Sequence, residues 1–203
     1  MPQSLVPQRS SLGLIVLGLL TDAPMHVYRM QKLIEQYGKD RVVNVRQRGS
    51  LYQAIQRLTR LGLVEAAQTV RGEGHPDRIV YAITETGRQT ATRWLREMLR
   101  ATGEEFPEFF AAVSVLVGLT PDDARQQLEA RANRLVSELA DVEALLAAEG
   151  GVPRLFTLEE ELRRAVLSAE LAWVRSVVDD LRAGRLVWDE TWRRQIAAER
   201  DAR

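Results

Sequence analysis

The sequence predicts a mainly α-helical protein with an N-terminal winged helix-turn-helix, including a two-stranded β-hairpin wing, and a C-terminal antiparallel helical domain. Three observations predict this class: the order of elements in the first hundred residues, the long apolar seams of the remainder, and a division of charge. Residues 1–100 contain 15 lysines and arginines against 8 acidic residues, whereas residues 101–203 contain 13 against 20. Net charges of +7 and −7 favour a basic module that binds a polyanion beside an acidic module of another purpose.

The composition is that of a soluble globular protein, with 45% hydrophobic and 28% charged residues in 203 positions. The longest apolar run, Leu12–Leu20, is too short to cross a bilayer and lacks the basic start of a signal peptide. The absence of cysteine excludes disulfides and thiolate chemistry. We therefore expect a cytoplasmic protein that does not associate with membranes.

The first predicted elements are helical. Residues 1–9 resemble a flexible arm, and a DNA-binding domain is predicted over 10–100. A serine cap at Ser10 or Ser11 leads into a short buried helix over Leu12–Leu20. Asp22-Ala23-Pro24 ends this helix and begins a second one, which closes near Gly38 and precedes a polar link. Its apolar residues recur at helical spacing and are Tyr28, Met30, Leu33, Ile34 and Tyr37.

A third helix, a hairpin and a fourth helix follow. Gly49-Ser50 is the predicted N-cap of the third helix, and Gly62 ends it. Its apolar face comprises Leu51, Ala54, Ile55, Leu58 and Leu61. The segments LVEAAQTV and IVYAIT read as strands joined by the turn-rich RGEGHPDR. Thr84 caps the fourth helix, whose apolar side comprises Ala91, Trp94, Leu95, Met98 and Leu99. This order of elements is that of a winged helix-turn-helix.

The second predicted domain, over 104–184, consists of helices that would form a dimer. An apolar helix over 104–119 is followed by a Thr120-Pro121 helix start and then by a long helix with a heptad-like seam. A last long helix, about 158–181, would turn Leu162, Val166, Ala169, Trp173 and Val177 inward. Residues 185–203 would be a short helix or disordered. The predicted dimerisation residues are Leu128, Leu135, Leu139, Val142, Leu146, Leu162, Val166 and Trp173.

Nothing in the sequence predicts catalysis. The two histidines, His26 and His75, lie far apart and match no metal-ligand spacing, and there is no P-loop or nucleophile elbow. Acidic pairs occur at helix starts, where the helix dipole accounts for them. We expect no enzymatic activity, no metal and no cofactor. His26 reads as a capping or packing residue near a helix start. Trp94 reads as a packing residue, with contact to an aromatic effector as the alternative.

A polar, acid-free face on the third helix favours nucleic acid. Arg48–Leu61 contains no acidic residue, although solvated helix faces usually mix charges of both signs. Glutamine and arginine on such a helix can read base edges in the major groove of DNA, while the wing lies along the minor groove or the phosphates. Glu73 and Asp77 leave the wing tip nearly neutral, which weakens the prediction that the tip contacts DNA. The predicted DNA contacts are Arg46, Arg48, Ser50, Tyr52, Gln53, Gln56, Arg57, Arg60, Arg71, His75 and Arg78.

Four segments in order resemble the PadR family of bacterial transcriptional regulators: LIVLGLL, PMHVYRM, GSLYQAIQRLTRLGLV and YAITETGR. The ELAWV segment at Glu170–Val174 resembles the helical region of the longer members. The resemblance implies a winged-helix dimer that represses transcription, C-terminal helices that swap across the two-fold axis, and release of DNA by small phenolic or aromatic ligands in some members. It also implies that Tyr52 of the GSLY match contacts a phosphate. The chain departs from the family pattern at Val27, commonly glycine, and at Gln53, frequently proline.

The function expected from these observations is that of a homodimeric, ligand-responsive repressor that binds double-stranded DNA at a pseudo-palindromic operator. Two-fold symmetry places the half-sites about 34 Å apart, or a multiple of this distance. Two alternatives remain open on the sequence. One is a winged-helix module that binds proteins through its acidic helical half, and the other is an architectural DNA binder that tolerates any sequence.

Overall fold

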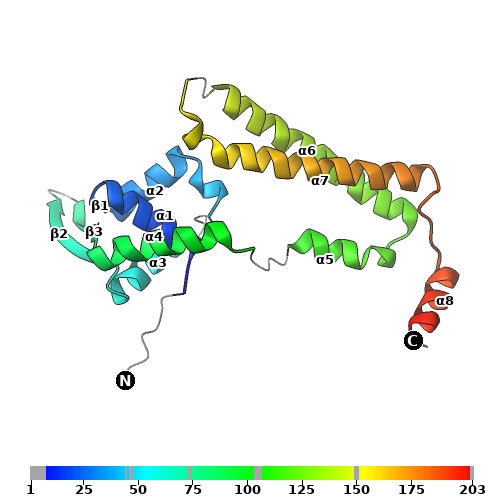
Figure 1. Cartoon of the computed structure of the whole chain (residues 1–203), viewed down its shortest axis with the longest axis horizontal. Coiled ribbons are helices and arrows are strands. Elements are labelled where there is room, and N and C mark those ends of the chain that lie inside the picture. The colour runs from blue at the N-terminus through cyan, green and yellow to red at the C-terminus, as the bar shows by residue number, and fades with distance from the viewer. Residues whose placement is uncertain are drawn as a thin grey trace. The chain divides into compact units, whose positions relative to one another are not determined.

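The computed structural model describes residues 8–43, 45, 48–72, 75–102, 107–148 and 151–201. The chain divides after residue 104 into two compact units (Figure 1), which are described separately below. The first unit contains the predicted winged helix-turn-helix. The second is built from helices.

Four α-helices and a small sheet form the described part of the first unit. The helices are α1 (Ser11–Asp22), α2 (Val27–Gln36), α3 (Arg48–Arg60) and α4 (Glu85–Arg100), with a 3₁₀ turn, η1, at Lys39–Arg41. The strands are β1 (Met25–His26), β2 (Val64–Gly72) and β3 (His75–Ile83), all antiparallel, in the order β1-β3-β2. The predicted hairpin is β2–β3, whereas β1 was not predicted. A strand of two residues has too few positions for an alternating pattern to appear.

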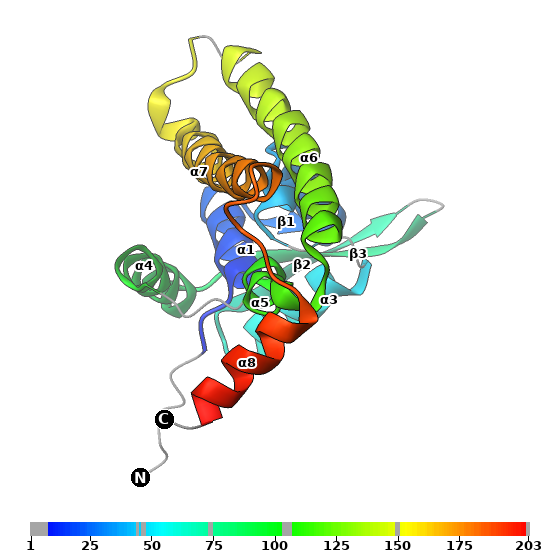
Figure 2. The ribbon, with the colours of Figure 1, turned by 90° about the vertical axis from the view of Figure 1, so that its right-hand side faces the viewer.

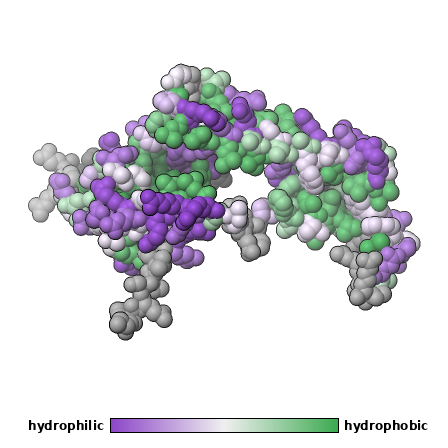
Figure 3. Space-filling view, in the orientation of Figure 1, coloured by the Kyte–Doolittle hydropathy of each residue, from purple (hydrophilic) through white to green (hydrophobic). Residues whose placement is uncertain are grey.

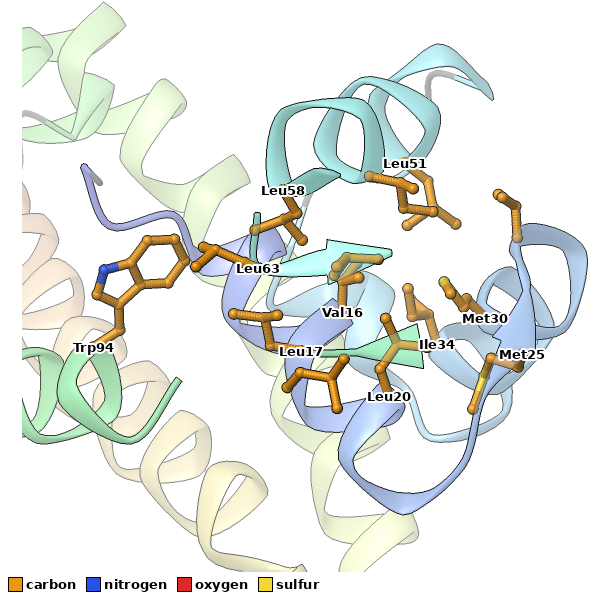
Figure 4. Close-up of a cluster of buried hydrophobic side chains, with 14 residues drawn as sticks. Val16, Leu17, Leu20, Met25, Met30, Ile34, Leu51, Leu58, Leu63 and Trp94 are labelled. Atoms are coloured by element: carbon orange, nitrogen blue, oxygen red, sulfur yellow. The ribbon is translucent and has the colours of Figure 1, made fainter. Parts of the chain in front are cut away.

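The core of the first unit is centred on α1. Because this helix is apolar on nearly all sides, it can pack on several neighbours at once, and it contacts α3, α4 and β3. Figure 4 shows Leu17 and Leu20 of α1 pointing toward side chains of the surrounding elements, among them Ile34 of α2 and Leu58 of α3. Helix α3 is therefore held by its leucine seam, which leaves its other side free for function.

Short polar contacts define the helix ends. The Gly13 amide donates to Ser10 Oγ at 3.1 Å, which confirms a serine cap on α1. The Arg29 amide donates to His26 Nδ1 at 3.0 Å, so His26 caps α2. Gly62 has a φ of 67° after α3, a conformation that favours glycine. The predicted cap of α3 at Gly49-Ser50 was wrong, because the helix already includes Arg48; glycine and serine are tolerated in a first turn whose amides have no helical partner.

The second unit pairs two long helices. Its described elements are α5 (Glu108–Ser114), α6 (Pro121–Ala148), α7 (Leu158–Arg182) and α8 (Glu190–Asp201), with 3₁₀ turns η2 (Leu116–Gly118) and η3 (Arg154–Phe156). Helices α6 and α7 lie side by side in both views (Figures 1 and 2). Their joint core contains Leu128, Leu135 and Val142 of α6 and Leu167, Leu171, Val174, Val178 and Leu181 of α7.

Two predictions for the second unit were wrong. The helix expected over 104–119 is instead the short α5 followed by η2, within the residues that the structure describes. The inward face of α7 was also misassigned, since Leu162, Val166 and Trp173 are 67%, 56% and 42% exposed. The physical reason is that α7 carries two apolar stripes at helical spacing, and only one of them packs on α6. None of the described helices is long and apolar enough to cross a membrane.

Candidate DNA-binding surface

Helix α3 presents one buried face and one exposed face. Leu51, Ile55 and Leu58 are almost fully buried. At 100° per residue, the side of the helix directly opposite this seam carries Gly49, Gln53, Gln56 and Arg60, all of them exposed. We call Gln53, Gln56 and Arg60 the outward face. Two amides that can donate and accept, followed by a guanidinium, are the chemistry that reads base edges.

Tyr52 lies on one flank of the outward face. Its side chain is 56% exposed and borders a surface recess shared with His26 and Tyr28 at the start of α2 and with Arg78 of β3. The His26 and Tyr28 rings stack, with centroids 6.2 Å apart. The pairing of His26 with Val80 places the start of α2 against β3 and so brings these groups together. Phenolic hydroxyls beside an arginine suit the sugar-phosphate backbone.

Arg57 and Ser50 lie on the other flank. Arg57 Nη2 donates to the carbonyl oxygen of Gln8 at 2.8 Å, which connects α3 to the segment just before α1. A second recess follows this flank and is lined by residues of α1, α3 and α4, including Ser10, Gln53 and Trp94. Trp94 is only 1% exposed, and its ring packs against Gly13. Packing therefore accounts for Trp94, and the effector contact stays a prediction.

The charge of this surface is positive along α3. Arg57 and Arg60 lie in its last turn, and no acidic residue lies between Arg48 and Leu61. The exposed backbone at Gly49, in the first turn, adds the positive end of the helix dipole. Arg78 of β3 is exposed and borders the Tyr52 recess. A phosphate chain on either side of the outward face would therefore meet hydrogen-bond donors.

The remaining predicted contacts lie at the ends of α3 and of the hairpin. Arg46 lies outside the described residues. Arg48 belongs to α3, and Arg71 and His75 belong to β2 and β3 near the hairpin end, but their side chains lie outside the described part. Two tyrosines that the sequence analysis places in the apolar spacing of the second helix are exposed instead: Tyr28 is 68% and Tyr37 is 60% exposed. Of the two, Tyr28 borders the Tyr52 recess.

A family model, the transcriptional regulator PadR-like family, matches residues 16–93, which begin within α1, end within α4 and contain the whole outward face. Residues 16–93 therefore form a PadR-like domain. A search of curated proteins found no significant match. The matched segment includes the leucine seam and the wing and ends just before Trp94.

Solved structures share the fold of this PadR-like chain over most of its length. Bacillus subtilis PadR in complex with operator DNA is 16% identical, with a TM-score of 0.68, covering 85% of this chain and 99% of that one. The Vibrio cholerae virulence activator AphA is 21% identical, with a TM-score of 0.67 and the same coverages. Bacillus subtilis PadR in complex with p-coumaric acid is 16% identical, with a TM-score of 0.64, covering 84% and 98%. At these identities the likeness concerns the fold.

The predicted dimerisation residues of the PadR-like chain fall into two groups. Leu128, Leu135 and Val142 are buried between α6 and α7 of the same chain, with Leu139 and Leu146 packed against them. Leu162, Val166 and Trp173 lie on the second stripe of α7, which is exposed. The first group therefore builds the helix pair. The second group leaves apolar surface exposed, although the Trp173 ring also contacts the Phe109 ring of α5, with centroids 5.8 Å apart.

Proposed function

We propose that this PadR-like regulator is a homodimer that binds a pseudo-palindromic operator and represses transcription from it. The observation that carries the proposal is the outward face of α3: three exposed polar side chains on an acid-free helix, held from behind by a fully buried seam. Gln53 and Gln56 can each form two hydrogen bonds with an adenine edge, and Arg60 with a guanine edge. Bacillus subtilis PadR, which shares the fold, has been solved with operator DNA.

Contacts to the DNA backbone would come from the flanks. Tyr52 and Arg78 border one recess, and Arg57 and Ser50 border the other, so both walls of a major groove would meet donors. A B-DNA major groove is about 12 Å wide, and an α-helix with side chains has a diameter of about 10–12 Å. The flanks of a seated helix therefore lie close to the phosphates. Arg46, Arg48, Arg71 and His75 would add to this backbone contact.

The exposed stripe of α7 supports the homodimer. Apolar side chains on this side of α7 and on the preceding turn are solvent-facing in the single chain. They are Leu155, Phe156, Leu158, Leu162, Val166 and Trp173. Figure 3 shows hydrophobic surface over the first turns of α7. A helix that is apolar on two sides buries both when it is stable, and α6 covers only one. A second copy of the chain would cover the other.

A small aromatic effector would fit a groove of the second unit. The groove, of about 730 Å³, lies between α5, η2 and α6, within the size range of small-molecule sites. Phe109 and Leu116 supply apolar walls, while Arg131 and Arg134 supply positive charge. Arg131 lies 3.6 Å above the Phe109 ring and pairs with Glu170, whereas Arg134 is exposed and forms no ion pair with any described residue. Arg134 would meet a carboxylate of the effector.

The experiment is an electrophoretic mobility shift of the region upstream of the protein's own gene, with increasing unrelated competitor DNA. A shift that survives excess competitor supports a sequence-specific regulator. A shift that competitor abolishes indicates an architectural binder. A folded protein that gives no shift contradicts DNA binding and favours a protein-interaction module.

Repression is tested separately, because the shared fold also occurs in AphA, a virulence activator. A reporter under the shifted promoter is measured with and without the regulator. Repression predicts higher reporter expression when the regulator is deleted, and lower expression in its absence would instead show an activator.

A further inference from the structure

We infer that Gln8–Ser10 forms an additional DNA-contacting element beside α3, in which Arg57 positions the segment and Arg9 binds the DNA backbone. The inference rests on the proposed DNA binding and extends it to residues ahead of the PadR-like match, which begins at residue 16. It also changes the role of Arg57, which the sequence predicts as a direct DNA contact and which the proposed function places among the backbone contacts.

Both neighbours of Arg9 are fixed to the domain. Ser10 is the N-cap of α1: its Oγ accepts from the Gly13 amide at 3.1 Å, and its carbonyl accepts from the Leu14 amide at 2.8 Å. On the other side, the Gln8 carbonyl accepts from Arg57 Nη2 at 2.8 Å. The backbone of Arg9 is thus anchored at both ends, while its side chain is exposed.

The anchoring contact places this segment on the flank of the outward face. Arg57 follows Gln53 by one helical turn, and the recess along this flank is lined by Ser10 of the segment together with Ser50, Gln53 and Arg57 of α3. When Gln53 faces a base edge, this flank faces the adjoining sugar-phosphate wall, because the helix nearly fills the groove. An arginine held here meets phosphates, and counterion release makes that contact favourable.

The geometry of the guanidinium suits Arg57 to hold the Gln8 carbonyl. Arginine carries five N–H donors in a rigid fork, so one donor can hold a carbonyl while the charge remains on the groove side. The side chain of Arg57 is only partly exposed, whereas that of Arg60 on the outward face is exposed. Arg57 is therefore a positioning residue whose main effect on affinity passes through Arg9.

The test measures fluorescence anisotropy of the labelled upstream region against salt concentration for the full chain and its variants. Arg9→Gln should weaken binding by roughly five- to tenfold for each subunit whose Arg9 no longer binds a phosphate. The slope of log K against log salt should fall by about 0.9 for each phosphate that is no longer neutralised. Arg9→Lys should restore most of the affinity, since the charge is kept. Arg96→Gln, at an exposed position on α4, removes an equal charge and should leave both quantities unchanged.

A double-mutant cycle separates positioning from direct contact. If Arg57 acts through Arg9, the fall in affinity of Arg9→Gln/Arg57→Gln is smaller than the product of the falls in the two single variants. Independent, multiplicative effects overturn the positioning role. An Arg9→Gln variant that binds like the wild type, while Gln56→Ala loses specificity, overturns the inference and leaves the proposed function intact. A wild-type protein that binds no DNA contradicts the proposed function itself. Thermal unfolding of each variant verifies that the domain is folded.

Discussion

At the scale of single residues, Gly87 fixes how closely α4 approaches the end of α3. A Cβ at this position would lie 2.1 Å from the Leu63 carbonyl oxygen, so no larger residue fits without moving backbone. The same junction contains Thr84, whose hydroxyl donates to the Gly62 carbonyl at 2.7 Å and accepts from the Gly87 amide at 3.0 Å. These contacts join the end of α3, the start of β2 and the start of α4. The angle between α3 and the wing depends on them.

Substitution of Gly87 should therefore be costly. Gly87→Ala forces a backbone shift at the junction, and we expect it to lower the free energy of unfolding by about 2–3 kcal/mol. Gly18→Ala in α1 is the matched control: its Cβ would meet no atom within 4 Å, and alanine favours a helix by up to about 1 kcal/mol. Urea unfolding followed by circular dichroism measures both. Equal stability of the two variants would contradict the close approach at Gly87.

At the scale of elements, α3 and α7 show what an amphipathic pattern can and cannot predict. Helix α3 has one apolar stripe, so its buried side and its outward face follow from spacing alone, and the absence of acids in Arg48–Leu61 is visible in the sequence. Helix α7 has two stripes, and spacing does not say which one meets α6. The sequence prediction selected the stripe containing Leu162 and Val166, whereas Leu171 and Val174 pack inward.

Contacts between distant parts of the chain were beyond sequence reasoning. The Arg57–Gln8 bond joins residues 49 positions apart, and neither residue type signals it. The two-residue strand β1 exists because the extended residues before α2 meet β3, with Met25 opposite Tyr81. The predicted caps at Ser10 and Thr84 were found, by contrast, because a helix cap is set by its own neighbours in sequence.

The α6–α7 pair contains an acid-sensitive bridge at Glu129. Arg125 hydrogen-bonds this carboxylate and lowers its pKa below the usual value, with a further contribution from Arg182 of α7 at 2.9 Å. A carboxyl with a depressed pKa stabilises the folded state above its unfolded pKa. That contribution disappears as the pH falls through the folded pKa.

We expect thermal stability to decrease as the pH falls from about 6 to about 3, across the usual glutamate range near 4.3. Glu129→Gln should be less stable than the wild type at neutral pH and should lose less stability on acidification, because it has no carboxyl to protonate. Glu143→Gln is the control, at an exposed position of α6 where no ion pair with a described residue forms. Identical pH profiles for wild type and Glu129→Gln would contradict the bridge. Circular dichroism melts supply the measurement.

At the scale of the whole molecule, the second stripe of α7 predicts self-association. We expect Leu162→Glu to shift the protein from twice the 22.9 kDa mass of one chain toward the single-chain mass, since a charge would enter an apolar contact. Ser168→Glu, an exposed position on a different side of α7, introduces the same charge and should leave the dimer intact. Light scattering coupled to gel filtration gives the mass. A fully dimeric Leu162→Glu variant would move the interface elsewhere.

Dimerisation and operator binding are linked by symmetry. In the proposed homodimer, two outward faces related by a two-fold axis would read two half-sites, so the affinity of the dimer for its operator would exceed that of one domain for one half-site. The Leu162→Glu variant should therefore bind a full operator more weakly than Ser168→Glu does. An effector would act by favouring a dimer in which the two outward faces are differently spaced.

The most direct test of the central claim compares operator and unrelated DNA for the wild type and Gln56→Ala at one salt concentration. Each good bidentate base contact gives about 1–3 kcal/mol of discrimination. We predict that Gln56→Ala lowers the ratio of operator affinity to unrelated-DNA affinity by about tenfold or more, while its affinity for unrelated DNA is retained. Gln89→Ala, at an exposed position of α4, should keep the wild-type ratio. An unchanged ratio in Gln56→Ala would contradict base reading by the outward face of α3.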